Sequence, residues 1–225
     1  MEEKVEAFFS RHDVNGEKYT TLSMSIFSKI FKSYNYGLRK SLSQMRGLSN
    51  SFKWAPSYYT YLLLSGTKLK RLLAKISKYR TQRIPNYLLK MFKKCIIYVG
   101  KGTANRDNSH LYDVKRAILK GGGLKSSKKN SIRKQWLNGG TLVVRKLHYG
   151  VSNFEACNNE YAVIKAVGLQ SLTNEINGQK YGAISSWPDH VVKNYGHMLL
   201  YNCLEGMLRE NPVYLDLKAI ITQLG

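Results

Sequence analysis

Arg106 and His110 form a pair of side chains whose types and spacing could act on a phosphate. Residues four positions apart lie on one face of a helix, so both would lie close to the segment that begins at Tyr98. A guanidinium and an imidazole directed at one point suit a phosphate whose negative charge grows in a transition state. Taken alone, however, the pair is better explained as two polar residues on a solvated helix face.

The segment Tyr98-Val99-Gly100-Lys101-Gly102 comes just before that pair. It predicts a strand that runs into a glycine turn and then into the start of a helix, where free backbone N–H groups favour a phosphate. Glycine turns are also common structural features, so the segment by itself does not establish a binding site.

Glu160 falls within the apolar stripe of an expected helix, a position that needs explanation. The stripe consists of Ala156, Val163, Ile164 and Val167. Burying a bare carboxylate costs several kcal/mol, so Glu160 must pair with a cation or bind a metal ion. The basic excess of the chain makes a structural salt bridge easy to form. The residues alone therefore favour neither solution.

These candidate residues need a scaffold, and hydrophobic periodicity predicts alternating strands and helices. Short aliphatic and aromatic runs predict strands at Tyr58–Leu64, Cys95–Val99 and Thr141–Leu147. Apolar residues that recur at three and four positions predict helices at Thr67–Tyr79, Ala104–Lys120, 153–167 and Tyr195–Arg209. This order indicates an α/β fold with a small sheet covered by helices.

The expected helix over 153–167 has the clearest boundaries. Ser152 and Glu155 have the S-x-x-E pattern of a capping box, and Gly168 is typical of a helix end. Three glycines from residue 121 should end the helix that begins at Ala104. The basic stretch Lys125–Lys134 that follows them is expected to be a loop.

The formal net charge of +22 is concentrated in one region. Between Gly66 and Lys134 there are 20 Lys and Arg against Asp107 and Asp113, a balance of +18, whereas residues 135–225 carry seven charges of each sign. Lysine and arginine bind polyanions by releasing counterions, so nucleic acid is the first partner to consider. Acidic lipid, ribosomal RNA and plain solvation of helix faces are the alternatives. The first expected helix would present Lys68, Lys70, Arg71, Lys75 and Lys78 to phosphates.

Cys95, Cys157 and Cys203 lie far apart and form no CxxC pair, which predicts neither a zinc site nor a disulfide framework. The N-terminus has no basic start followed by an apolar stretch, and runs such as Tyr58–Leu64 are far shorter than the roughly 20 residues that cross a bilayer. We therefore expect an intracellular protein of the nucleus or cytoplasm with no membrane partner. The oligomeric state is not determined by these features.

Taken together, the chemistry-bearing residues resemble the motifs of the GIY-YIG nucleases. In place of the first motif, Gly-Ile-Tyr, the chain has Tyr59-Thr60-Tyr61, with Tyr61 at the tyrosine position. Tyr98 begins the second motif, and Arg106 and His110 match the arginine and the His or Tyr one helical turn later. Glu160 matches the metal-binding glutamate.

Within this family, the chain is most similar to the nuclease domain of animal endonucleases that carry ankyrin repeats and a LEM domain. The similar stretches are Ile97–Thr103, Ala166–Leu169, Leu172-Thr173-Asn174 and Tyr181-Gly182. The resemblance implies a nuclease domain over 58–182, between an N-terminal extension of 1–57 and a C-terminal helical extension of 183–225. It also implies a small three-stranded mixed or antiparallel sheet flanked by helices.

The resemblance implies one-metal hydrolysis of DNA, including branched or structured DNA. Glu160 would hold Mg²⁺ or Mn²⁺ with water as most of its other ligands. The metal and Arg106 would draw charge from the scissile phosphate. Tyr61 would be the base on water once nearby cations lower its pKa from about 10, with Tyr98 and His110 orienting water and phosphate.

By the same resemblance, Lys101 and Asn174 would contact DNA. An inactive basic protein that binds DNA or RNA is the first alternative, and a structural or ribosome-associated RNA-binding protein is the second. The first would lack one of Tyr98, Arg106 or Glu160, and all three are present. The second leaves a carboxylate on an apolar stripe unexplained. The sequence therefore favours a nuclease.

Overall fold

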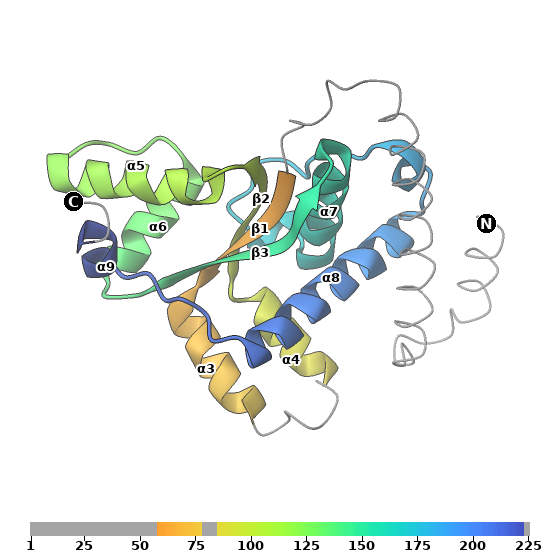
Figure 1. The fold of residues 1–225 in the computed structure, drawn as a ribbon, viewed down its shortest axis with the longest axis horizontal. Coiled ribbons are helices and arrows are strands. Elements are labelled where there is room, and N and C mark those ends of the chain that lie inside the picture. The colour runs from red at the N-terminus through yellow and green to blue at the C-terminus, as the bar shows by residue number, and fades with distance from the viewer. Residues whose placement is uncertain (1–57, 78–84, 223–225) are drawn as a thin grey trace. The chain divides into compact units, whose positions relative to one another are not determined.

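The computed structural model describes residues 58–77 and 85–222 of the chain. The expected extension of residues 1–57 and the predicted DNA contact Lys78 lie outside the described residues. Within the described ranges, three strands form one antiparallel sheet in the order β2-β1-β3 (Figure 1). The predicted α/β fold is confirmed, and of the two expected sheet types the antiparallel one is found. The strands are β1 (Tyr58–Ser65), β2 (Ile96–Thr103) and β3 (Leu142–Val151).

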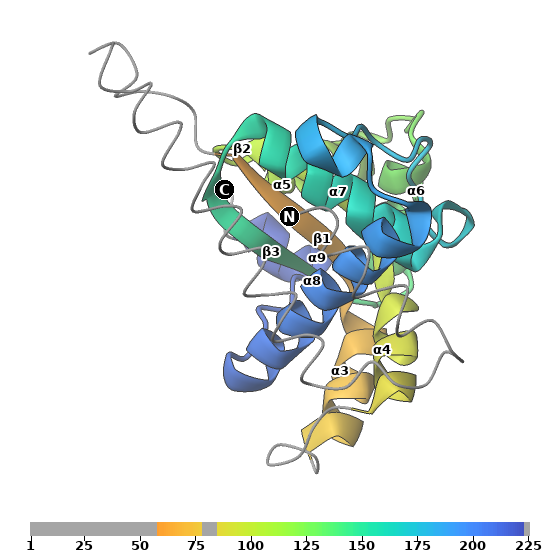
Figure 2. The same ribbon diagram turned by 90° about the vertical axis from the view of Figure 1, so that its right-hand side faces the viewer.

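The central strand β1 is buried because helices cover both faces of the sheet. On one face, Leu63 enters a core formed with α5 (Arg106–Lys120), α6 (Ser127–Leu137) and α9 (Leu217–Thr222). On the other face lies α7 (Asn153–Val167), where the Thr60 hydroxyl donates to the Ala156 carbonyl at 3.1 Å. Helix α8 (Asp189–Arg209) packs against α7 (Figures 1 and 2).

Two helices lie between β1 and β2 in the chain, at one end of the sheet. Helix α3 (Gly66–Ile76) follows β1 directly, and α4 (Asn86–Lys93) comes just before β2 (Figures 1 and 2). The two helices pack against each other, and α4 also packs against α8. Leu69 and Leu72 are fully buried, so the periodicity predicted the inner face of α3 correctly. Helix α4 was not predicted.

The prediction that β2 ends at Val99 in a glycine turn is wrong. Gly100, Lys101 and Gly102 continue the strand, and Gly100 lies opposite Tyr61 of β1. Backbone pairing with β1 holds these glycines extended, although glycine is depleted in strands generally. The segment is therefore not the phosphate-binding turn that its glycines suggested.

Those glycines serve close packing instead. A Cβ atom on Gly100 would lie 2.6 Å from the ring of Tyr98 and 2.8 Å from the ring of Tyr61. A Cβ atom on Gly102 would lie 2.9 Å from the Cβ of Arg106. The missing side chains thus let two tyrosine rings and an arginine approach the strand, as glycine within a strand often does.

The prediction of a loop over Lys125–Lys134 is also wrong, because most of this stretch lies in α6. Its charged sequence gives little helical signal, but Ile132 and Trp136 are buried in the core beside α5 and α9. The Trp136 ring N–H donates to the Leu215 carbonyl at 3.1 Å. Packing of these two side chains in the core stabilises the helix, whereas local helix propensity does not.

The remaining elements match their predictions with shifted ends. Helix α5 starts at Arg106 rather than Ala104, β3 runs on to Val151 rather than Leu147, and α8 starts at Asp189 rather than Tyr195. The early start of α8 follows its contact with α7, which buries most of its length.

Helix α7 begins and ends where the sequence predicted. The Ser152 hydroxyl accepts a hydrogen bond from the Glu155 N–H at 3.2 Å, which is half of the predicted capping box. Gly168 ends the helix with a φ of 95°, a conformation that favours glycine. A Cβ atom on Gly196 of α8 would lie 2.0 Å from the Ala162 carbonyl oxygen, so the two helices touch backbone to backbone.

Replacing Gly100 by Ala should lower the free energy of unfolding by about 1–3 kcal/mol, because the new methyl group forces apart the buried Tyr61 ring and the partly exposed Tyr98 ring. Chemical denaturation of the wild type and the variant measures this loss. Gly123→Ala is the matched control, since an added Cβ there meets no atom within 4 Å. Equal stability of the two variants would show that the rings have room to move.

Candidate active site

Two tyrosines face each other where β1 and β2 pair. The rings of Tyr61 and Tyr98 have centroids 6.1 Å apart, on the sheet face that α5 and α6 cover. The Tyr61 side chain is buried, whereas that of Tyr98 is partly exposed. The space left by Gly100 sets this approach, so the strand register positions both rings.

Arg106 reaches the same place through the sharp connection from β2 to α5. Ala104 takes a φ of 50° there, which is unusual for a residue with a side chain, and its carbonyl lies 2.9 Å from the Tyr59 hydroxyl. Asp107 is 2.6 Å from the same hydroxyl and 3.5 Å from the Lys146 ammonium. These contacts fix the first turn of α5, whose first residue, Arg106, is exposed beside Gly102.

His110 lies one turn further along α5, as its spacing from Arg106 predicted. Its ring centroid is 6.3 Å from that of Tyr98, at an interplanar angle of 71°. The ammonium of Lys128 lies 2.7 Å from His110 Nε2 and 3.8 Å from the centroid of the Tyr98 ring. Burial and this ammonium lower the pKa of His110 to about 4, so the ring is neutral near pH 7.

Glu160 approaches from α7, on the other side of the β2 edge. Burial raises its pKa to about 7, and this outweighs the opposite effects of Lys101, whose backbone also donates a hydrogen bond, and of Lys128 and Arg106. Across the described residues, Glu160 has no ion-pair partner within 4.0 Å. The structural salt bridge considered from sequence is therefore not found.

The pKa shifts of Tyr61 and Tyr98 run opposite to the expectation that nearby cations lower the pKa of Tyr61. Burial raises the pKa of Tyr98 to about 12, with Glu160 adding to the rise, and raises that of Tyr61 further above its usual value. Arg106 acts in the lowering direction on both, but burial outweighs it. The net effect of the protein's own groups is thus to raise the pKa of Tyr61, whereas a base would require a lowered pKa. Both tyrosines are neutral hydroxyl groups near pH 7.

Lys101 and Asn174, the predicted DNA contacts beside the site, already have partners within the protein. The Lys101 ammonium donates to the Asn153 side chain at 2.8 Å. The Asn174 amide accepts from the Val99 N–H at 3.0 Å and donates to the Val99 carbonyl at 2.8 Å. Asn174 therefore caps the free edge of β2, and its contact with DNA stays a prediction.

Helix α3, with the predicted contacts Lys68, Lys70 and Arg71, lies apart from this cluster. It follows Ser65 at one end of β1, whereas Arg106 lies beyond the opposite end of the pairing between β1 and β2. An eight-residue strand spans roughly 25 Å at about 3.3 Å per residue. All three side chains are exposed, beyond the end of β1 that lies opposite to Arg106.

Sequence reasoning missed Lys128 as a neighbour of the site. The residue falls in the stretch predicted to be a loop, and nothing in its local pattern separates it from the other lysines. Only the packing of α6 against α5 brings it to His110 and Tyr98. Sequence reasoning also missed the contacts of Tyr59 with Asp107, because a Tyr-x-Tyr pattern on a strand does not reveal them.

The chemistry of this donor set fits a hydrated hard cation. Glu160 supplies a carboxylate with no ion-pair partner among the described residues, and burial makes its charged form costly despite the nearby cations. The described residues hold no cluster of three or more His, Cys, Asp or Glu side chains that could enclose a metal. An ion held there would keep water for most of its ligands, as Mg²⁺ does.

Comparison with known proteins identifies the fold. A family model for the LEM-3-like GIY-YIG domain matches residues 58–221. The chain belongs to this family. The match supports a nuclease, and the predicted resemblance to the GIY-YIG nucleases is confirmed.

Relatives of the LEM-3-like GIY-YIG chain are longer proteins. It is 31% identical over 154 residues to ankyrin repeat and LEM domain-containing protein 1 of Mus musculus, covering 68% of this chain and 28% of the relative. The homolog from Caenorhabditis elegans is 33% identical over 129 residues, covering 56% and 18%. The Homo sapiens protein is 31% identical over 160 residues, covering 68% and 25%. The alignments thus span about a quarter or less of each relative.

No solved structure matches this GIY-YIG chain. Of the helices in residues 58–77 and 85–222, none is long and apolar enough to cross a membrane. The family match extends to residue 221, past the predicted nuclease boundary at 182. Helices α8 and α9 lie within the matched range and pack against α7 and α5, respectively.

The raised pKa of Glu160 predicts a pH-dependent loss of stability in metal-free protein. Because the folded pKa is raised from 4.5 to about 7, the free energy of unfolding should fall between these pH values, by roughly 3 kcal/mol. Glu160→Gln should abolish this fall and be the more stable protein at pH 8. Urea denaturation from pH 4.5 to 8 measures the difference.

Mg²⁺ should restore stability at pH 8 to the wild type and not to Glu160→Gln, because the metal binds the folded carboxylate. Glu175→Gln, an identical change at an exposed position, should stay within about 0.5 kcal/mol of wild type at every pH. A flat profile for the wild type would mean that the Glu160 charge is already compensated.

Proposed function

We propose that this chain is a metal-dependent endonuclease that hydrolyses phosphodiester bonds in DNA. The observation that carries the proposal is the cluster around β2, in which two tyrosines, Arg106 and His110 lie on one side and an unpaired, half-buried Glu160 on the other. Buried polar groups without structural partners are typical of functional sites. Membership of the LEM-3-like GIY-YIG family also supports a nuclease.

Each side chain has a role that its environment suits. Arg106 is exposed and always charged, so it binds the scissile phosphate and stabilises its growing charge. The neutral hydroxyls of Tyr61 and Tyr98 orient the attacking water and a phosphate oxygen. Glu160 holds Mg²⁺ or Mn²⁺, which when bound supplies Lewis-acid stabilisation of the leaving oxygen.

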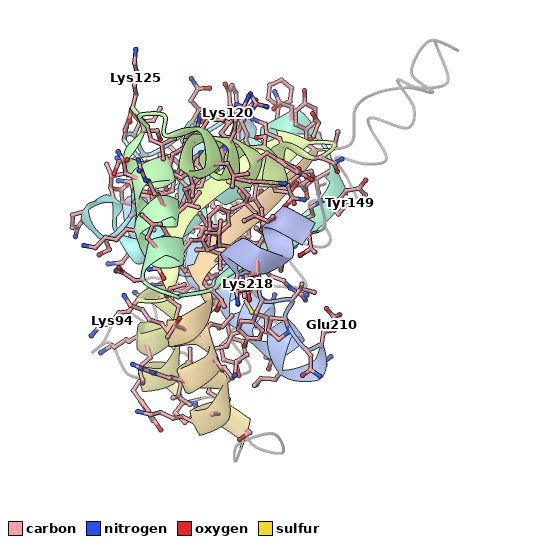
Figure 3. All side chains as sticks on the ribbon, turned by 90° about the vertical axis from the view of Figure 1, so that its left-hand side faces the viewer. Lys94, Lys120, Lys125, Tyr149, Glu210 and Lys218 are labelled. Atoms are coloured by element: carbon pink, nitrogen blue, oxygen red, sulfur yellow. The ribbon has the colours of Figure 1, made fainter. Side chains whose placement is uncertain are left out.

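The exposed basic groups of the described surface include two separate sets. One is the α3–α4 end, with Lys68, Lys70, Arg71 and Lys94, and the other is the α5–α6 end, where Lys120 and Lys125 project (Figure 3). Two separated basic surfaces suit a substrate with two duplex arms, because each arm meets its own cations. We propose branched or structured DNA on this ground, with α3 contacting duplex away from the cut.

An inactive protein that binds DNA or RNA through the same basic surfaces is the alternative. It would share the salt-dependent affinity and lack metal-dependent cutting. The three cysteines are buried free thiols, which suits the reducing nucleus or cytoplasm where such DNA is found.

Glu160→Gln should lower the rate of DNA nicking by at least about 100-fold and leave binding unchanged, because it removes the charge that holds the metal. Labelled linear and branched DNA, incubated with saturating protein in Mg²⁺ and in chelator, measure the single-turnover rate. Glu210→Gln, the same change at an exposed residue next to the end of α8, should keep the wild-type rate. Equal cutting by wild type in chelator would contradict the metal-dependent mechanism.

Reversing Lys70 and Arg71 together to Glu should weaken DNA binding and flatten its salt dependence. Each lost phosphate contact changes the slope of log affinity against log salt by about 0.9, so the slope should fall by up to about 2. Lys165→Glu with Lys193→Glu makes the same charge change on α7 and α8 and should flatten the slope less. Equal slopes for the two variants would show that α3 does not contact the DNA.

A further inference from the structure

Lys128 occupies a position that is unfavourable for a lysine in three respects. Its side chain is 8% exposed, so its charge is largely removed from water. It lies in the first turn of α6, where the helix dipole disfavours cations and no acidic residue compensates. Arg106 and Lys129 are close enough to lower its pKa, which burial brings to about 8. Such conflicts with local rules mark functional positions.

The contacts of Lys128 do not provide a structural reason for its burial. No carboxylate lies within 4.0 Å of its ammonium among the described residues. Its recorded partners are His110 Nε2, at 2.7 Å, and the face of the Tyr98 ring, at 3.8 Å. Both partners belong to the candidate site, whereas Lys129, the next residue, pairs with Asp113 at the surface.

The contact with His110 determines where that ring carries its proton. An ammonium group has three donors and no acceptor, so Nε2 must accept from it. A neutral imidazole that accepts at Nε2 holds its proton on Nδ1. In the described structure His110 Nδ1 is buried and has no hydrogen-bond partner. A buried N–H without an acceptor is unfavourable, so this tautomer depends on the contact with Lys128.

We propose that Lys128 is a positioning residue of the nuclease site, which holds His110 in the neutral Nδ1–H tautomer and fixes its ring beside Tyr98. This inference rests on the proposed function. It excludes His110 as a general base, because the nitrogen that would accept a proton is occupied.

Nitrogen-15 NMR of the His110 ring in the full chain tests the tautomer without any activity. At pH 7 the wild type should show a protonated Nδ1 and an unprotonated Nε2. The charged or titratable groups around the ring are Tyr98 on β2, Arg106 and Asp113 on α5, and Lys128 and Lys129 on α6. Lys128→Met should raise the pKa of His110 and release the tautomer. A protonated Nε2 in the wild type would overturn the proposal.

Single-turnover cleavage of branched DNA in Mg²⁺ tests the consequence. Lys128→Met should lower the rate about 10- to 100-fold, as loss of a group that orients a functional side chain does. Because Lys128 acts through His110, the double variant with His110→Ala should lose no more than His110→Ala alone. Additive losses would overturn the proposal.

Lys165→Met is the matched control. Lys165 also pairs with a side chain, Asp189 at 3.1 Å, and lies 5.7 Å from the Tyr161 ring, but this cluster is at the surface. Its removal should leave the rate within about twofold, because exposed pairs contribute little. If wild type does not cut DNA at all, the proposed function fails, and the NMR result still decides the contact of Lys128 with His110.

Discussion

The close approach of side chains to the glycines of β2 is the constraint on which the rest of the site depends. Gly100 leaves room for the Tyr61 and Tyr98 rings, and Gly102 leaves room for the start of α5 at Arg106. A larger residue at either position would separate groups that must act together. The sheet register and the turn at Ala104 then place the remaining residues, because both follow from how β2 pairs with β1.

Burial dominates the electrostatics around these strands. It raises the pKa of Tyr98 and Glu160 and lowers that of His110 and Lys128, in each case against at least one nearby charge that acts in the opposite direction. Removing charges from water is unfavourable unless they are paired, so the charged forms of these groups are destabilised. The same desolvation would strengthen contacts to a bound substrate, because the effective dielectric constant is low.

The packed elements of the fold hold the side chains of the site in place. Tyr59, Asp107 and Lys146 fix the first turn of α5 through buried contacts, while α7 brings Glu160 to the other side of β2. Helices on both faces of the sheet hold these two elements in place. A site at the edge of a small sheet can thus be rigid without a large domain, because each side chain comes from an element packed on the core.

The sequence by itself determined the strands, the helix faces and the candidate residues on them. The capping pattern at Ser152 and Gly168 predicted α7, and the spacing of Arg106 and His110 predicted their shared face, because these are local properties of the chain. Local patterns could not reveal that Gly100 lies within a strand, since backbone pairing with β1 decides this. Nor could they single out Lys128, which resembles every other lysine in its stretch until Trp136 and Ile132 pack α6 against the core. Contacts between residues distant in sequence arise only on folding, so the tertiary structure alone decided which lysine lies beside His110 and left Glu160 with no ion-pair partner among the described residues.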